Sequence, residues 1–416
     1  MGSIGMVSQP APETHSFLQD PNRDHYDVAI IGGATSGSAI AFFLTANPDF
    51  EGSILIVERD PTLKESATRA SNYCVRQQFA TEINIKIAQY AAEFINNFKQ
   101  IVGTNDCPEL AIKNFGYLYL ASDEEFCQVL REDQALQASC GAGTQLVSKE
   151  FIAKRYPFFK LDDVLMGSFN TQDEGEFDGW KIFQTCRKVA VARGVEYVQN
   201  EVVDIIVRDN TVQNIVLKSG QHVKVGKVVN AAGTRSGYVS KMAGIHLPLE
   251  ARPRYTYIFE GENHFNKDIP LTIDPSGVHF RPFGTSQFLV GAPPAGPEVG
   301  IDVNDFQMRG DVWTEKLKPV IERRMPTLGK LHVKEAWIGH YDFNTFDHNA
   351  IIGPHHEIEN FLFCCGFSGH GSQQAPACGR AVSELITYGH FKTLDLSPLQ
   401  YGRIPRNEPL VERAVI

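Results

Sequence analysis

A glycine-rich turn followed by a carboxylate is the first feature of this sequence that can do chemistry. An apolar run at 27–31 ends at Gly32, and small residues continue to about position 45. A second apolar run at 54–57 ends on Glu58. Together they predict a strand, a tight turn, a helix and a second strand, the unit that holds a pyrophosphate on a helix N-terminus. We therefore expect a bound dinucleotide.

Separate positions of this unit have separate roles. Gly32 permits the tight turn after the first strand, and Gly37 allows the helix to pack closely on that strand. Glu58 lies about 20 residues beyond Gly37, where a carboxylate accepts hydrogen bonds from a ribose hydroxyl. Ala34 departs from the pattern, because its methyl group stands where a second glycine lets the backbone approach the phosphates. The order of strand, turn, helix, strand and acid is nevertheless complete.

Composition and charge exclude several classes of protein. The 416 residues are 43% hydrophobic and 21% charged, as in an ordinary globular protein with two packed lobes. The net charge of −10 argues against nucleic acid as a partner and against binding to anionic lipid. No apolar run approaches the length of a membrane span, and the first 25 residues lack the features of a targeting signal. We expect a cytoplasmic protein.

The cysteines and other reactive residues form none of the patterns of a metal or hydrolase site. The eight cysteines show no CxxC spacing, so reduced and mostly buried thiols are expected. HExxH, GxSxG and Walker sequences do not occur. We therefore predict no metal.

The rest of the chain alternates between helical and strand patterns, which predicts an α/β fold with a Rossmann-like lobe and an antiparallel-sheet lobe. Apolar residues at steps of three and four predict one helix over 81–102. Alternating runs at 196–229 lead into the buried strand VVNAAG, 228–233. The region 247–340 is rich in alternating strands, and a strand at 360–365 precedes a helix at 373–388 with Pro376 in its first turn.

Several motifs together resemble a known family. They are VVNAAG at 228–233, DPSG at 274–277, NTFDHNAIIGPH at 344–355 and GFSGHGSQQAPACGRA at 366–381. With the N-terminal unit, they are similar to the FAD-dependent oxidoreductases of the D-amino-acid oxidase superfamily. The resemblance is nearest to the sarcosine oxidase and dimethylglycine dehydrogenase branch and to the FAD-dependent oxidoreductase domain proteins within it, and it covers about residues 26–389. The dinucleotide that it implies is FAD.

The resemblance implies a discontinuous FAD-binding domain and a substrate domain that covers the flavin ring. The expected FAD-binding domain comprises residues 26–110, 165–245 and 341–395. The expected substrate domain comprises residues 111–164 and 246–340. A flexible tail at 1–25 and a C-terminal tail at 396–416 complete the chain.

The glycine loop 366–371 is expected beside the flavin. The positive end of the helix that follows stabilises the negative charge that a reduced flavin carries near N1 and the C2 oxygen. Ser368, Gly369, His370 and Gly371 are the predicted neighbours of the ring. The full set of predicted FAD contacts is Gly32, Gly33, Ala34, Ser36, Gly37, Glu58, Arg59, Val203, Ala232, Gly233, Gly366, Ser368, Gly369, His370, Gly371 and Gln373.

Two arginines are candidates for substrate binding. By the resemblance, Arg76 stands where sarcosine oxidases carry an arginine that grips the substrate carboxylate, and a guanidinium fork suits that task. The lysine that supplies their second contact is replaced here by Gln373. Arg281 projects from the same strand face as His279 and can supply the missing charge if that face lines the cavity; otherwise Phe280 lines it. Each arginine also has a purely structural interpretation.

Two histidines complete the predicted catalytic set, His340 and His370. His340 falls at or next to the position of the cysteine that bonds the flavin in sarcosine oxidases, so a thioether link is not expected. It can bond or hydrogen-bond the flavin, act as a base, or simply pack beside Trp337 and Tyr341. Tyr255 and Tyr257 alternate on another strand and either line the pocket or pack the sheet.

The function that follows is oxidation of the C–N bond of a small amine or N-substituted amino acid to an imine, by hydride transfer to FAD. The electron acceptor is oxygen or another molecule. Leu289 is found near the position of the family's oxygen-activating lysine, which makes a dehydrogenase a serious alternative to an oxidase. Oxidation of a 2-hydroxy acid, and a flavin-bearing assembly or scaffold protein with little turnover, remain alternatives.

Overall fold

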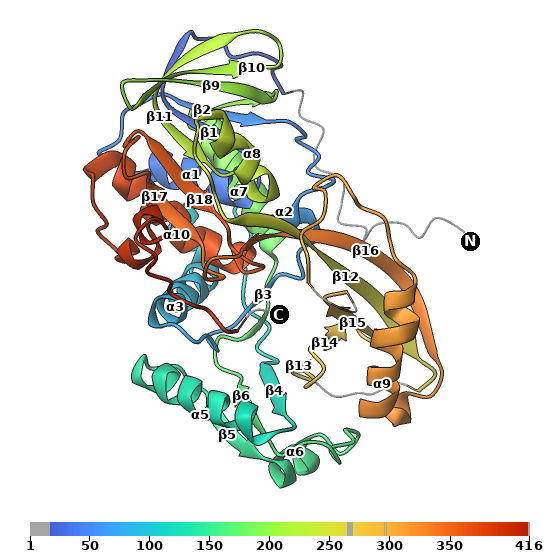
Figure 1. The fold of residues 1–416 in the computed structure, drawn as a ribbon. Coiled ribbons are helices and arrows are strands. Elements are labelled where there is room, and N and C mark those ends of the chain that lie inside the picture. Colours follow the sequence, from blue (N-terminus) through green and yellow to red (C-terminus); the bar gives the residue numbers. More distant parts are fainter. Residues whose placement is uncertain (1–16, 264–268, 295, 297, 415–416) are drawn as a thin grey trace.

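The computed structural model describes residues 17–263, 269–294, 296 and 298–414. They form two lobes, each built on its own sheet (Figure 1). Of the predicted N-terminal tail, residues 1–16 lie outside the described part. Residues 17–25 lie against the first sheet, where Leu18 pairs with Val198.

The first lobe is a mainly parallel sheet in the strand order β17-β18-β11-β1-β2-β8, extended by the antiparallel strands β9 and β10. Central β1 is parallel to both β2 and β11, as expected for buried apolar runs. The strands of this sheet are β1 (His25–Ile31), β2 (Ile54–Glu58), β8 (Glu196–Gln199), β9 (Val202–Arg208), β10 (Thr211–Leu217), β11 (His222–Asn230), β17 (Ile351–Pro354) and β18 (Phe361–Cys365).

Helices α1 and α10 pack closely on each other. Small residues make this possible, since a Cβ added to Gly379 of α10 would lie 2.7 Å from the Cβ of Ala39 in α1. The helices of this lobe are α1 (Thr35–Ala46), α2 (Ala67–Ala70), α3 (Glu82–Asn96), α4 (Phe98–Val102), α7 (Gly179–Ala192), α8 (Ser236–Met242) and α10 (Gly371–Tyr388), with the 3-10 turns η1 (Gly233–Arg235), η4 (Ser397–Leu399) and η5 (Tyr401–Arg403).

The second lobe is a mainly antiparallel sheet in the order β16-β12-β15-β14-β13-β4-β6-β5. Its strands are β4 (Tyr117–Ala121), β5 (Gln145–Ser148), β6 (Met166–Asn170), β12 (Leu249–Gly261), β13 (Leu271–Ile273), β14 (His279–Phe283), β15 (Gln287–Ala292) and β16 (Leu331–Asn344). Its helical segments are α5 (Glu124–Ser139), α6 (Lys149–Arg155), η2 (Val312–Leu317), α9 (Lys318–Arg324) and η3 (Pro326–Leu328). A short sheet of β3 (Cys74–Val75) and β7 (Gly175–Glu176) lies between the lobes.

Three expected boundaries differ from the observed ones. The helix predicted over 81–102 is broken at Asn97, between α3 and α4, where the side-chain amide donates to the Glu93 carbonyl oxygen at 2.9 Å. Helix α10 begins at Gly371, so Pro376 lies inside the helix and not in its first turn. Strand β6 pairs with β4 and β5, so the boundary expected at residue 165 falls after β6.

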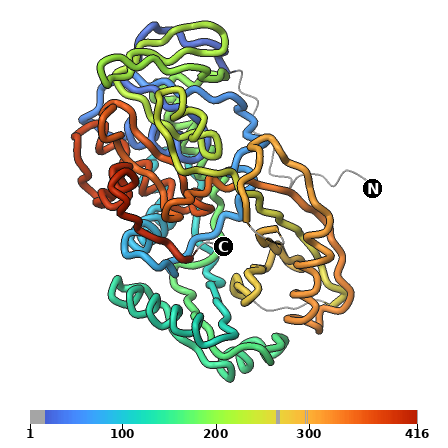
Figure 2. Tube along the Cα trace, in the orientation of Figure 1, coloured from blue at the N-terminus to red at the C-terminus, as the bar shows by residue number. Residues whose placement is uncertain are grey.

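The predicted C-terminal tail is packed along most of its length. Arg403 forms a buried ion pair with Asp347 at 2.6 Å. Further on, the Glu412 carboxylate is fully buried beside α3, and the last described residues lie between the two lobes (Figure 2). No helix among the described residues is long and apolar enough to cross a membrane.

Candidate functional site

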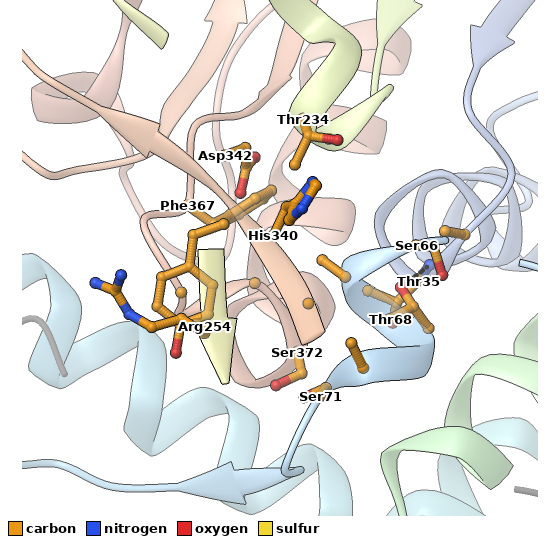
Figure 3. Close-up of a pocket in the computed structure, with 18 of the residues that line it drawn as sticks. Thr35, Ser66, Thr68, Ser71, Thr234, Arg254, His340, Asp342, Phe367 and Ser372 are labelled. Carbon is orange, nitrogen blue, oxygen red and sulfur yellow. Dashed lines mark hydrogen bonds between the residues drawn. The ribbon is translucent and has the colours of Figure 1, made fainter. Parts of the chain in front are cut away.

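A long cavity opens where the carboxyl ends of β1 and β11 meet the second sheet (Figure 3). It encloses about 1670 Å³ of atom-free space, its solvent-filled mouth included. The first lobe contributes its glycine turn, Glu58 and the start of α10, and the second lobe contributes Arg254, His279 and His340. The cavity therefore joins the two glycine-rich motifs to polar residues of the antiparallel sheet.

The turn after β1 has the shape that the sequence predicts. Gly32 has a φ of 101°, a left-handed conformation, and a Cβ there would collide with the Ala231 carbonyl oxygen. A Cβ on Gly37 would collide with the Gly32 carbonyl oxygen. Both positions need glycine for close packing of the strand, the turn and the helix.

The first turn of α1 is only partly capped at the cavity. The Thr35 N–H donates to the Thr68 hydroxyl at 3.3 Å, but the N-cap, Ala34, makes no side-chain capping bond, and both Ala34 and Ser36 line the cavity. Ala34 has an ordinary φ of −73°, so alanine causes no strain in place of the usual glycine. A helix start of this kind suits an anion such as a pyrophosphate.

The hydrogen bonds of Glu58 fix its carboxylate in a position that suits the two hydroxyls of a ribose. Its two carboxylate oxygens accept from the backbone N–H of Gly33 at 2.8 Å and of Asp60 at 2.9 Å. The side chain is buried at the cavity wall, and burial raises its pKa. Each oxygen keeps a further lone pair for a ribose hydroxyl. Neighbouring Arg59 also lines the cavity and pairs with Glu65 at 2.9 Å.

The end of β16 shapes the second glycine loop. The Asp342 carboxylate accepts from the Gly366 N–H at 2.7 Å, and the Ser368 hydroxyl accepts from the Asn344 N–H at 3.0 Å. Burial raises the pKa of Asp342 to about 6. The loop then enters α10, whose N-cap His370 makes no side-chain capping bond.

Only part of that loop faces the cavity. Gly369 and Gly371 line it. Ser372, at the start of α10, lines it as well (Figure 3). Gly366, Ser368 and His370 do not line it, and neither does Gln373. The uncapped start of α10 is therefore a second set of backbone donors directed at the same cavity.

Arg76 and Gln373, singled out together in the sequence, meet in the structure. The backbone N–H of Arg76 donates to the Gln373 side-chain oxygen at 2.9 Å. The buried guanidinium lines the cavity, lies over the Phe79 ring at 4.5 Å, and hydrogen-bonds His370 Nε2 at 3.0 Å and the Ala414 carbonyl oxygen. Burial and this arginine lower the pKa of His370, so its ring is neutral.

Arg281 does not line this cavity. It pairs with Glu176 at 3.1 Å and donates to the Asn72 carbonyl oxygen at 3.0 Å. Its strand neighbour His279 does line the cavity, and burial beside the arginines lowers its pKa to about 3. Of the two strand faces that the sequence left open, the His279 face is the one that meets the cavity, and it presents a neutral imidazole there rather than Arg281.

Arg254, which no sequence pattern singled out, is with Arg76 one of two buried arginines of the wall (Figure 3). It lies over the Tyr341 ring at 4.6 Å and donates to the Glu298 carboxylate at 3.0 Å. Its Nε has no hydrogen-bond partner among the described residues. The RPRY sequence offered one signal, since an arginine that leads into a largely apolar strand segment needs a buried partner or a ligand.

His340 lies at the cavity on β16. It stacks on Phe306 with ring centroids 4.1 Å apart, and its Nε2 lies 2.9 Å from the Asp305 carbonyl oxygen, which makes Nε2 the donor. Burial lowers its pKa, so the ring is neutral. Nδ1 is left as an acceptor with no partner among the described residues.

The remaining candidates lie in the cavity, in the core or, for Val203, on the surface. Ala232 and Gly233 line the cavity, as does Tyr255, whereas Tyr257 packs on Trp313. Val203 is 44% exposed on β9 and Leu289 is buried beside Ile258; neither lines the cavity. The cysteines are free thiols, and the described residues contain no cluster of side chains suited to a metal ion.

Comparison with known proteins decides the family. The family described as FAD dependent oxidoreductase (DAO) matches residues 27–385. The chain belongs to this family of FAD-dependent oxidoreductases. It is 35% identical to FAD-dependent oxidoreductase domain-containing protein 1 of Xenopus laevis, over 99% of this chain and 89% of that protein. It is 26% identical to mouse mitochondrial sarcosine dehydrogenase, over 92% of this chain and 40% of that protein.

Solved structures share the fold. L-proline dehydrogenase from P. horikoshii has a TM-score of 0.80 at 24% identity, over 93% of this chain and 99% of that one. Glycine oxidase from Geobacillus kaustophilus has a TM-score of 0.77 at 17% identity, over 91% and 98% of the two chains.

The residues present fit FAD, the cofactor of this family. The start of α1 suits the pyrophosphate, and Glu58 suits the adenosine ribose. The uncapped start of α10 suits the pyrimidine edge of the flavin. Because these groups line one continuous cavity, a single extended dinucleotide can reach all of them.

Proposed function

We propose that this protein oxidises the C–N bond of a small amine or N-substituted amino acid to an imine. The observation that carries this proposal is the pair of buried arginines, Arg76 and Arg254, on the cavity wall around neutral His279. Arg76 forms no ion pair within the described residues, so its guanidinium is free for a substrate carboxylate, and Arg254, which also pairs with Glu298, adds a second guanidinium to the same wall. The names of several relatives, sarcosine dehydrogenase and glycine oxidase among them, support the same class of substrate.

The residues position the substrate more than they transfer its protons. When bound, FAD supplies the hydride acceptor. Arg76 or Arg254 would hold the carboxylate and so orient the C–H bond next to the reacting ring. The substrate reacts as the neutral amine, whose nitrogen lone pair forms the C=N bond as the hydride leaves, so the ammonium proton is lost to solvent before hydride transfer. His279 and His340 are neutral, so they add no positive charge beside the imine cation that results. The start of α10 would stabilise the negative charge that develops on hydride transfer.

The electron acceptor that we propose is a molecule other than oxygen. In the part of the chain that the structure describes, no lysine lines the cavity. Leu289, near the position of the family's oxygen-activating lysine, is packed in a small apolar cluster with Ile258 and Trp337. Without a cation to stabilise superoxide-like charge, reaction with oxygen should be slow.

One observation favours a second candidate, oxidation of a 2-hydroxy acid. The unpartnered His340 Nδ1 is an acceptor at the cavity, and an alcohol needs a base for its hydroxyl proton. A neutral imidazole fixed by stacking on Phe306 can take that proton.

Product analysis separates the two candidates. The FAD-loaded protein would be incubated with an artificial electron acceptor and with N-methyl amino acids, cyclic imino acids, primary amino acids or 2-hydroxy acids. The proposal predicts that N-methyl amino acids give formaldehyde and the primary amino acid, because the imine hydrolyses in water. Formation of a 2-oxo acid from 2-hydroxy acids alone would contradict it and support the second candidate.

A further inference from the structure

A second cavity lies beside the one described above. It encloses about 1330 Å³ of atom-free space, its mouth included, and none of the FAD-fitting residues lines it. Its walls come from the substrate lobe and from the C-terminal segment, with Tyr119 on β4, Gln137 on α5, and Arg413 and Ala414 near the end of the chain.

The two cavities lie end to end on one face of the second sheet. Strand β13 pairs with β4 so that Leu271 is opposite Tyr117 and Ile273 is opposite Tyr119. Leu271 and Tyr117 line the first cavity, and Ile273 and Tyr119 line the second cavity. Because alternate residues of a strand share a face, the second cavity begins about 7 Å further along the strands.

Both substrate-site arginines touch the second cavity's wall. Arg254 donates to the Glu298 carboxylate at 3.0 Å, and Arg76 donates to the Ala414 carbonyl oxygen. Glu298 and Ala414 line the second cavity. A carboxylate held by these arginines would therefore have the second cavity next to it.

Two buried polar atoms of the second cavity have no hydrogen-bond partner among the described residues. They are Tyr119 Oη and Gln137 Oε1, in side chains that are 7% and 3% exposed. The Gln137 amide nitrogen donates to the Phe79 carbonyl oxygen at 3.0 Å, which fixes the orientation of the amide. Since buried polar atoms are almost always hydrogen-bonded, these two indicate a ligand.

The charge of the walls selects the kind of ligand. Four carboxylates line the cavity, those of Asp123, Asp133, Asp274 and Glu298, and the only basic side chain among the described lining residues is Arg413. Three of the carboxylates form ion pairs, Asp133 with Arg413 at 2.6 Å, Asp274 with Arg324 at 2.8 Å and Glu298 with Arg254 at 3.0 Å, whereas Asp123 has no ionic partner among the described residues. Carboxylates repel a second carboxylate and attract an ammonium group or the N–H of an amide. The unpartnered oxygen of Gln137 likewise needs a donor.

We infer that the second cavity binds the distal end of an elongated substrate, and that this end carries a hydrogen-bond donor, an ammonium or a primary amide. The inference rests on the proposed function, since it extends the substrate from the carboxylate site. The substrate class is then an N-substituted amino acid with a long side chain, rather than N-methylglycine itself.

Binding to the FAD-loaded protein reduced with dithionite tests this inference, because the reduced protein cannot oxidise the ligand. Calorimetry would compare Nα-methyl-lysine, Nα-methylnorleucine, Nα-methylglutamate and N-methylglycine. We expect Nα-methyl-lysine to bind about tenfold more tightly than Nα-methylnorleucine, because about one charge-assisted hydrogen bond is gained. Nα-methylglutamate should bind most weakly of the three long ligands.

The Tyr119→Phe variant removes an unpartnered hydroxyl and breaks no hydrogen bond within the protein. It should reduce the preference for Nα-methyl-lysine several-fold and leave N-methylglycine unaffected. Tyr257→Phe is the matched control, because Tyr257 lies on the same sheet but lines neither cavity. Val129→Trp, which fills the second cavity from α5, should exclude the long ligands only.

Equal affinity for Nα-methyl-lysine and Nα-methylnorleucine in the unmodified protein would overturn the inference, as would a preference that survives both cavity variants. The cavity would then hold only solvent. Failure of the proposed function would look different. The protein would still bind Nα-methyl-lysine more tightly than Nα-methylnorleucine, but it would oxidise no N-methyl amino acid.

Discussion

Replacement of Glu58 by glutamine isolates the contribution of one carboxylate to FAD binding. The carboxylate accepts from Gly33 and Asp60 and keeps lone pairs for a ribose hydroxyl. A hydrogen bond to a charged acceptor contributes about 1.5–3 kcal/mol. Its loss should raise the Kd for FAD about 10- to 100-fold. Because an amide has one acceptor oxygen, one backbone N–H also loses its partner, which should reduce the free energy of unfolding by about 1–3 kcal/mol.

Fluorescence titration of the apoprotein with FAD would measure the Kd, and thermal denaturation would measure the stability of the same apoprotein. Glu201→Gln is the matched control, because Glu201 makes a solvent-accessible ion pair with Lys218 away from the cavity. A folded Glu58→Gln protein that binds FAD within twofold of the unmodified protein would refute the assignment. Glu58 would then only stabilise the turn.

Four further changes have defined outcomes. Gly32→Ala should destabilise the protein by about 1–3 kcal/mol in thermal denaturation, because φ is 101° and the Cβ collides with Ala231. Glu412→Ala leaves four donors without their acceptor and should reduce the free energy of unfolding by about 3 kcal/mol or more in urea titrations. Arg76→Leu should raise KM for carboxylate substrates more than for amines without a carboxylate, in steady-state assays. Burial raises the pKa of Glu174 to about 7 from 4.5, so the folded state holds this proton more tightly than the unfolded state does. The stability that this proton contributes is complete below pH 4.5 and is lost as the pH rises to about 7. Denaturant titrations should therefore show that the free energy of unfolding of the unmodified protein falls, relative to that of Glu174→Gln, by up to about 3 kcal/mol between pH 4.5 and 7. Unaltered unfolding of Gly32→Ala or of Glu412→Ala would contradict the role given to that residue. For Arg76, the contradicting result is an unchanged ratio of the two KM values. For Glu174, it is a difference in stability from Glu174→Gln that is the same at pH 4.5 and pH 7.

Local patterns predicted the elements that hold the cofactor. The turn at Gly32, the close packing at Gly37 and the acid at the end of β2 depend on backbone conformation and short-range spacing, so a single sequence contains them. The starts of α1 and α10 could be located in the same way, although the true start of α10 lies two residues before the predicted one.

Contacts between distant segments could not be predicted from those patterns. Arg254 lines the cavity because β12 and the first lobe meet there, whereas Arg281 does not line it and pairs with Glu176 of the short sheet between the lobes. Asp342 shapes the loop at Gly366 through a bond between segments that no local spacing specifies. For the same reason the tail at 396–416 gave no sign of its buried Glu412.

The most direct test of the central claim is anaerobic reduction of the FAD-loaded protein by its substrate. The oxidised-flavin absorbance would be followed after addition of one equivalent of each amine, imino acid or hydroxy acid. We predict that an N-methyl amino acid bleaches the band, and that the colour returns slowly in air and rapidly with an artificial acceptor. A protein whose flavin is bleached by dithionite but by no amine or amino acid would contradict the account.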